Sequence, residues 1–142
     1  MDSREWIDIV IKVMALVGVY IAALNYRSQR IIKKGEWLKS LFEKFYENPT
    51  YKEVRRWLDN NELENKINAD DNSVSDDDEK FTDFLNFFEF IANLEEEHQI
   101  TITDASNLFD YYLKQIKKST VCIQWIKKYG FEKLDGLLNK IK

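Results

Sequence analysis

Residue types that bend the chain, cross-link it or bind transition metals through sulfur or imidazole are scarce in this sequence: four glycines, one proline, one cysteine and one histidine among 142 residues. So few glycines and prolines argue against a β-fold, which needs frequent tight turns. The lone Cys122 excludes an intrachain disulfide and a cysteine-based zinc site, and it suits a reducing compartment such as the cytosol. Long unbroken helices remain, and we therefore predict an all-α protein.

Charge is sorted along the chain, although the net charge is only −4. Residues 1–58 carry 11 basic and 7 acidic side chains, residues 59–110 carry 2 and 16, and residues 111–142 carry 8 and 2. The acidic middle disfavours nucleic acid as a partner. The alternation of sign favours head-to-tail contact within or between chains, but a solvated acidic loop explains most of the pattern.

A long apolar run is present near the N-terminus. From Trp6 to Leu24 the only charges are Asp8 and Lys12, and as a helix this run extends over about 28 Å, close to the ~30 Å hydrocarbon core of a bilayer. Four basic residues follow it: Arg27, Arg30, Lys33 and Lys34. By the positive-inside rule we predict a single-pass protein of the bacterial inner membrane, with its N-terminus outside, an anchor over residues 1–26 and a cytoplasmic helical domain over residues 27–142.

Two other interpretations of this run are weaker. A cleaved signal peptide would carry its basic residues before the run and not after it. A buried helix of a soluble oligomer is the more serious alternative, because Asp8 and Lys12 would each cost about 2.5–3.5 kcal/mol at the middle of a bilayer. Both residues lie near the outer end, one helical turn apart, where they can pair or reach toward water.

Small and polar residues gather on one face of the predicted span. Steps of four and three residues connect Asp8, Lys12, Ala15, Val19, Ala22 and Tyr26, and Gly18 lies beside them. Helices associate in lipid where backbones approach closely and polar groups find partners. We call Asp8, Lys12, Ala15, Gly18 and Ala22 the seam. We predict that copies of the chain associate through the seam into a homo-oligomer. A ring with Asp8 and Lys12 lining a pore and a simple dimer both fit this pattern.

The helical period continues from the span to Asn48-Pro49, where the proline predicts a break. That helix would be roughly 60 Å long, with about half of it in the cytoplasm. Beyond it we predict a bundle of four or five short helices. Residues 60–80 lack apolar periodicity and predict an acidic loop. The first predicted helix covers residues 51–58, and the second begins at a capping box of Ser75 and Asp78. A third helix extends from Thr103 to Lys118. One further helical segment ends at Gly130, and another follows it.

The helix after Ser75 is apolar except for a line of four polar residues: Asp83, Asn86, Glu89 and Asn93. A carboxylate on a buried helix, such as that of Glu89, needs a partner, and Arg55 or Arg56 could supply a bidentate one. We interpret these residues as a structural polar pair. A polar line that simply faces water is an equal alternative.

Patterns that carry chemistry are weak. Glu95-x-x-His98 has the spacing of a helical metal motif, but a di-iron bundle needs a second such motif and this chain has a single histidine. There is no glycine-rich phosphate loop, and helical ribonucleases need an arginine shortly before the histidine, which is missing. We predict no enzyme, no catalytic residue, no metal and no cofactor. The C-terminal lysines are interpreted as solvated helix backs.

Three stretches carry a resemblance to known proteins: Asn48-Pro49 with Arg55-Arg56-Trp57-Leu58, Phe84 to Glu89, and Ile100 to Leu113 before a helix that contains Trp125. Their order resembles an uncharacterised bacterial family of single-span proteins with a small helical cytoplasmic domain. The architecture is similar to that of the membrane accessory proteins of type VI-B CRISPR systems, which resemble a degenerate helical nuclease domain on one span and assemble as a membrane ring.

The resemblance implies a pore-forming antiphage defence effector that makes the inner membrane permeable, with membrane lipid and a cytosolic defence protein as partners. The first alternative is a membrane-tethered interaction module that binds a cytosolic partner without a pore. The second alternative is a degenerate helical RNase.

Overall fold

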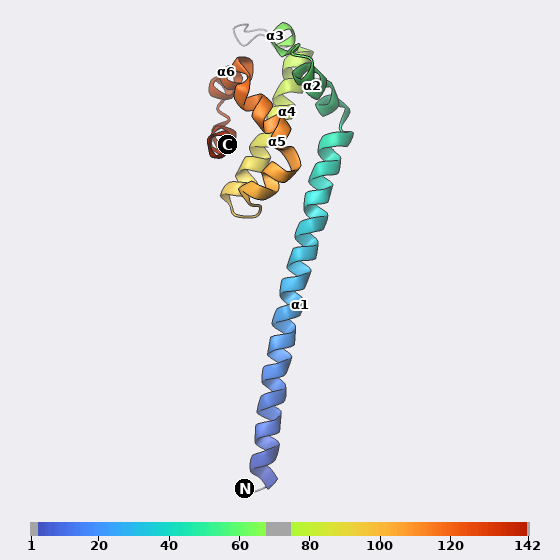
Figure 1. Ribbon diagram of the computed structural model, residues 1–142, viewed down its shortest axis with the longest axis vertical. Coiled ribbons are helices and arrows are strands. Elements are labelled where there is room, and N and C mark those ends of the chain that lie inside the picture. The colour runs from blue at the N-terminus through green and yellow to red at the C-terminus, as the bar shows by residue number, and fades with distance from the viewer. Residues whose placement is uncertain (1–2, 68–74, 142) are drawn as a thin grey trace. The chain divides into compact units, whose positions relative to one another are not determined.

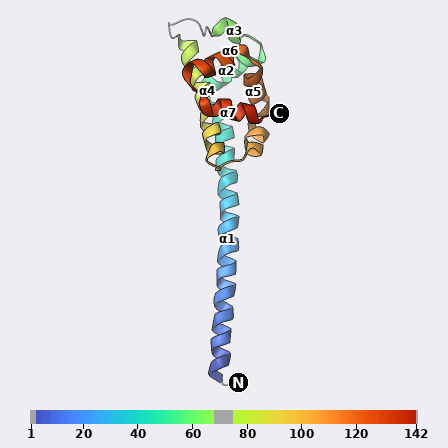
Figure 2. The same ribbon diagram turned by 90° about the vertical axis from the view of Figure 1, so that its left-hand side faces the viewer.

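The computed structural model describes residues 3–67 and 75–141, and every regular element in this part of the chain is a helix. The helices are α1 (Ser3–Glu47), α2 (Pro49–Asp59), α3 (Leu63–Lys66), α4 (Asp76–Glu96), α5 (Ile102–Lys118), α6 (Thr120–Tyr129) and α7 (Glu132–Lys140). Figure 1 labels α1 to α6, and Figure 2 labels α7. The predicted all-α class is confirmed. The predicted number of four or five short helices is wrong, because six helices follow α1 in the described residues.

The chain divides into two compact units within α1: one ends at Ser40 and the other begins at Leu41. The described residues of the N-terminal unit all belong to α1, whereas the C-terminal unit contains the end of α1 and all the other described helices. The predicted boundary between anchor and domain after residue 26 rests on the charge pattern and stays a prediction.

The break between α1 and α2 lies at Asn48-Pro49, as the sequence predicts. Asn48 Oδ1 accepts hydrogen bonds from the backbone N–H groups of Thr50 (2.9 Å) and Tyr51 (3.3 Å), which caps α2. Pro49 has no N–H to offer the carbonyl of Phe45 four residues earlier. The last turn of α1 therefore has carbonyl groups that need donors from elsewhere.

The predicted acidic loop over residues 60–80 is partly helical. The short α3 lies inside it, and Leu63 and Ile67 are both buried because they are four residues apart and share one helix face. α4 already begins at Asp76, after the capping box between Ser75 and Asp78 that the sequence predicts. The rest of the predicted loop, residues 68–74, lies outside the described residues.

Local signals also set the boundaries of α5 and α6. Thr101, and not Thr103, caps α5: its hydroxyl accepts from the Asp104 N–H (3.1 Å), and the Asp104 carboxylate accepts from the Thr101 N–H (2.7 Å). The reciprocal pair satisfies two donors at once, which Thr103 could not do alone. α6 ends at Gly130, whose φ of 76° is left-handed and favours glycine.

An aromatic cluster fills the centre of the C-terminal unit. The fully buried ring of Phe45, near the end of α1, lies 5.1–5.8 Å between centroids from Phe84, Phe87, Phe88, Phe109 and Tyr112. Aromatic pairs at this distance contribute about 0.5–1.5 kcal/mol each beyond their buried area. Three of these rings come from α4, which also contacts α2, α5 and α7 (Figure 2). α4 is thus the central helix of the bundle.

Candidate functional site

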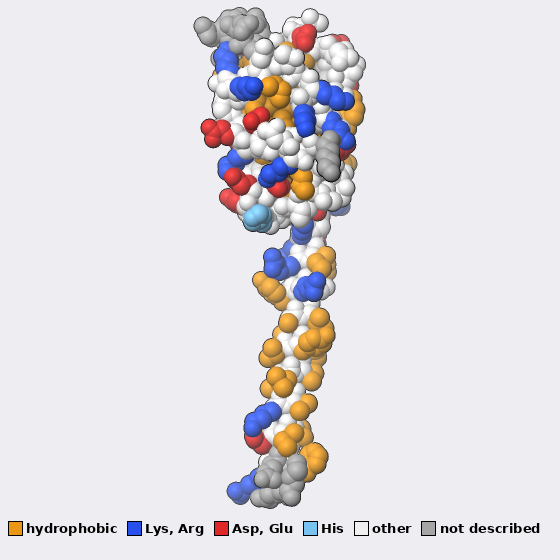
Figure 3. Space-filling view, turned by 60° about the vertical axis from the view of Figure 1, so that its left-hand side comes forward, with side chains coloured by type: hydrophobic (Ala, Val, Ile, Leu, Met, Phe, Trp, Pro, Cys, Tyr) orange, Lys and Arg blue, Asp and Glu red, His pale blue; other side chains and the backbone are white. Residues whose placement is uncertain are grey.

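The N-terminal part of α1 exposes an unbroken apolar surface. Every apolar side chain from Trp6 to Leu24 is exposed, and the most apolar window has a mean hydropathy of 2.3 with none of it buried. Figure 3 shows hydrophobic side chains along this helix with few charges among them. By length and composition α1 is able to cross a membrane, and it is the one such helix in the described residues.

The seam lies on this exposed surface. Lys12 Nζ lies 2.7 Å from Asp8 Oδ2, so the two charges pair within one chain, and both side chains are exposed. The three small residues Ala15, Gly18 and Ala22 are exposed as well. A Cβ added at Gly18 would meet no atom within 4 Å. The seam therefore offers space in which another helix could approach closely.

Basic residues follow the apolar segment over the next two turns of α1. Arg27, Arg30 and Lys33 are exposed and Lys34 is half-buried. The guanidinium of Arg30 lies 5.9 Å from the ring centroid of Tyr26. Anionic lipid headgroups at a membrane surface attract basic side chains, and aromatic side chains are enriched at the same depth. A basic cluster with an aromatic residue beside an apolar helix is therefore typical of a segment at a membrane surface.

Arg55 is buried, with 7% of its surface exposed, and it closes the end of α1. Nη1 donates to the carbonyl of Phe45 (2.5 Å) and Nη2 donates to the carbonyl of Tyr46 (3.1 Å). The guanidinium carbon lies 4.8 and 4.6 Å from the ring centroids of the same two residues. The negative end of the helix dipole and two ring faces thus balance the buried charge.

Glu89 caps α7 from the side. Its Oε1 accepts from the Lys133 N–H (3.2 Å) and its Oε2 from the Leu134 N–H (2.7 Å). Phe131, which precedes α7, has no capping side chain, so a carboxylate from α4 satisfies two free N–H groups and complements the helix dipole.

The predicted pairing of Glu89 with Arg55 or Arg56 is corrected by these contacts. Among the described residues neither arginine is bonded to Glu89: Arg55 is held by α1, and Arg56 is exposed. Each charge instead satisfies the free groups at a helix end. A helix that begins or ends without a local cap is the sequence signal that could have indicated these partners.

Two further side-chain contacts join α4 to α7. Lys140 Nζ lies 2.6 Å from Glu95 Oε2, and Lys133 Nζ pairs with Glu96. The hydrogen bond between Lys133 and Glu96 raises the pKa of the lysine and lowers the pKa of the carboxyl. Glu95 is therefore bound to a lysine, while His98 is exposed. In the described part of the chain, no three histidine, cysteine or carboxylate side chains are placed to hold a metal ion.

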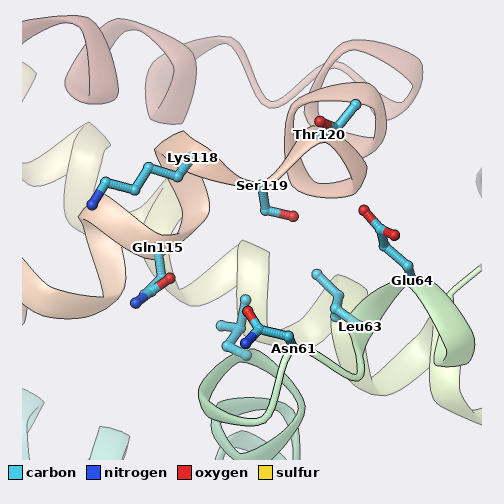
Figure 4. Close-up of a pocket in the computed structure, with 8 residues that line it drawn as sticks. Asn61, Leu63, Glu64, Gln115, Lys118, Ser119 and Thr120 are labelled. Atoms are coloured by element: carbon cyan, nitrogen blue, oxygen red, sulfur yellow. The ribbon is translucent and has the colours of Figure 1, made fainter.

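A polar pocket of about 290 Å³ lies between the α2–α3 turn and the junction of α5 with α6. Figure 4 shows the Glu64 carboxylate and the Ser119 hydroxyl pointing toward one another at its edge. Ser119 Oγ accepts from the Cys122 N–H (3.3 Å) and so caps α6. Burial raises the pKa of the neighbouring Cys122 thiol to about 12, which leaves little thiolate near neutral pH.

Comparison with known proteins gives no match: no protein-family model, no curated protein and no solved structure matches this chain. The functional inference therefore rests on the surfaces and contacts described above.

Proposed function

We propose that this chain is a self-associating single-span protein of the bacterial inner membrane, with its N-terminus outside and its helical bundle in the cytoplasm. The observation that carries the proposal is the apolar segment of α1, which is exposed along its whole length from Trp6 to Leu24. Soluble monomers rarely expose a continuous apolar surface of this extent. The basic residues after the segment support the orientation.

The seam supports self-association. Small residues let two helix backbones approach, and Gly18 has open space beside it. Asp8 and Lys12 neutralise one another within a chain, which lowers the cost of placing them near the edge of the hydrocarbon. Copies of α1 therefore associate through the seam, and the bundle of each copy is held at the membrane surface.

The experiment has a matched pair of variants. The mass of the detergent-extracted protein is measured by light scattering with a correction for bound detergent. Ala15→Phe places a ring on the seam, and Val17→Phe places the same ring on the opposite face, after a further rotation of about 200°. We expect an assembly that Ala15→Phe dissociates and Val17→Phe preserves. A monomeric parent protein, or equal effects of the two variants, would contradict the proposal.

A pore-forming role in antiphage defence is the second candidate. The observation that favours it is that the Asp8–Lys12 pair lies on the same face as the small residues, so a ring of chains would place these charges around its centre. Expression should then depolarise cells, and Asp8→Asn or Lys12→Gln should change the leak while the assembled mass stays the same. An assembly that causes no leak would refute the pore and favour a membrane-tethered interaction module.

A further inference from the structure

The seam and the basic residues that follow it lie on one face of α1. A spacing of seven residues connects Lys12, Val19, Tyr26 and Lys33. Arg30 lies four residues after Tyr26. Residues at these spacings share a helix face, so Arg30 and Lys33 continue the seam beyond the apolar segment. Figure 3 shows Lys and Arg side chains directly after the hydrophobic ones along this helix.

The basic side chains at this position are exposed and are not neutralised within the chain. We call Arg27, Arg30 and Lys33 the basic face, and they cover about 120° of the helix circumference. All three are exposed, and among the described residues no acidic side chain forms an ion pair with them. Residues 25–40 contain a single acidic side chain, that of Glu36. The basic face therefore carries positive charge that is open to an anion.

Association through the seam brings the basic faces of two copies together, because both features lie on the same side of α1. Packed helices lie about 8–10 Å apart between their axes. This distance is comparable to the Debye length of about 8 Å at physiological salt, so like charges on facing helices still repel. An anion between the copies removes this repulsion. It contacts basic side chains of two chains at once, and it therefore binds the assembly more tightly than the monomer.

The apolar surface beside the basic face indicates the class of anion. Leu24 and Tyr20 lie three and seven residues before Arg27, so they share one side of α1 with it. Both are exposed, with 49% and 65% of their surfaces accessible. A soluble anion leaves these side chains uncovered. The acyl chains of a phospholipid cover them while its phosphate lies beside the guanidinium groups, so charge and apolar surface together match an anionic phospholipid.

We propose that anionic phospholipid stabilises the assembly of this chain by binding the basic faces of neighbouring copies. The phosphate accepts charge-assisted hydrogen bonds from Arg30 and Lys33, and the acyl chains lie against Tyr20 and Leu24. This role of the lipid rests on the proposed function, in which copies associate through the seam. The seam supplies the contact between helices, and the lipid supplies the opposite charge.

The test compares the assembly of the full chain in two lipids. The extracted protein is placed in neutral detergent with either phosphatidylglycerol or phosphatidylcholine at the same mole fraction. The protein concentration at half-assembly is obtained from the light-scattering mass, corrected for bound detergent and lipid. Because each basic residue strengthens binding to an anionic surface about fivefold, we expect phosphatidylglycerol to lower this concentration at least about fivefold.

Three double variants locate the effect. Arg30→Gln with Lys33→Gln removes two charges from the basic face, and the half-assembly concentration should then be equal in the two lipids. Arg30→Lys with Lys33→Arg keeps the charge and should keep the response, which separates charge from helix structure. Lys52→Gln with Lys127→Gln removes the same charge from exposed positions on the bundle and should respond as the parent chain does.

Other outcomes of this experiment would overturn the assignment. Equal half-assembly concentrations of the parent chain in both lipids would exclude the lipid role, and the seam would still stand if Ala15→Phe dissociates the assembly. A double glutamine variant of the basic face that keeps the response, or a bundle variant that loses it, would exclude the basic face. Pyrophosphate that reproduces the effect in phosphatidylcholine would show that a free phosphate suffices. A parent chain that stays monomeric in both lipids would contradict this role and the proposed function together.

Discussion

Replacement of Arg55 by methionine tests whether a buried cation stabilises the end of α1. Methionine keeps an unbranched apolar chain in the same space but has no donor. The carbonyls of Phe45 and Tyr46 would then lose the guanidinium that now lies 2.5 and 3.1 Å from them. Pro49 cannot replace it, because it has no N–H.

The expected magnitude follows from these contacts. Hydrogen bonds from a charged donor contribute about 1.5–3 kcal/mol each, and the contacts with two ring faces add about 0.5–2 kcal/mol. Removal of the charge also recovers part of the free energy spent on burying it. We therefore expect the free energy of unfolding to fall by about 2–4 kcal/mol, which lowers the Tm by at least about 8 °C for a domain of this size.

The assay is thermal and guanidinium unfolding of the full chain in detergent, followed by near-ultraviolet circular dichroism of the aromatic cluster. Arg56→Met is the matched control: its side chain is exposed, and we expect a change within about 0.5 kcal/mol. Arg55→Lys should give an intermediate loss, because one ammonium cannot span both carbonyls as the fork of arginine does. A loss below about 1 kcal/mol in Arg55→Met, or an equal loss in Arg56→Met, would refute the reasoning.

Three more predictions concern other side chains of the helical bundle. Glu89→Gln keeps an acceptor but removes the charge at the start of α7. Chemical denaturation should therefore show that the free energy of unfolding falls by about 1 kcal/mol. The control Glu97→Gln, at an exposed residue, should leave the free energy of unfolding almost unchanged. Burial, followed by the charge of Asp59, raises the pKa of Tyr112 to about 12. Because the unfolded tyrosine ionises near pH 10, this group's contribution to stability should be full below pH 10 and decline toward pH 12. Tyr112→Phe should flatten that decline in pH-dependent melts, and an unchanged slope would contradict the assignment. The pKa of about 12 for Cys122 predicts that iodoacetamide alkylates the folded chain about a thousandfold more slowly than the unfolded chain at neutral pH, and equal rates would show that the thiol is accessible.

Three helix boundaries with a local signal could be predicted, whereas the prediction that α5 starts at Thr103 misses the equally local capping box of Thr101 and Asp104. The break at Asn48-Pro49, the Ser75 cap of α4 and the end of α6 at Gly130 all follow from residues within one turn. α3 could not be predicted in this way. Its position depends on the burial of Leu63 and Ile67, and one pair of apolar residues among polar neighbours is too short a pattern to show a helical period.

The seam could be predicted from the sequence, whereas the partners of the predicted polar pair could not, because the seam lies within one helix and those partners lie on distant segments. The seam is a property of a single helix, so residue spacing alone indicates which side chains share its face. The partners of Glu89 are 44 and 45 residues away along the chain, at the start of α7. The composition of the buried helix shows that Glu89 needs a donor, but only the packing of α4 against α7 determines which donor is near.

The Asp8–Lys12 contact separates two parts of the proposed function. If each charge had to find its partner on another chain, assembly and the position of the charges could not be tested independently. Because the pair forms within one chain, removal of both charges leaves the small residues of the seam free to pack. Under the proposed function, assembly is then expected to depend on Ala15 and its neighbours, whereas any effect on ion flow is expected to depend on the charges. A protein that assembles through the seam and passes no ions is therefore fully consistent with the membrane proposal and inconsistent only with the pore.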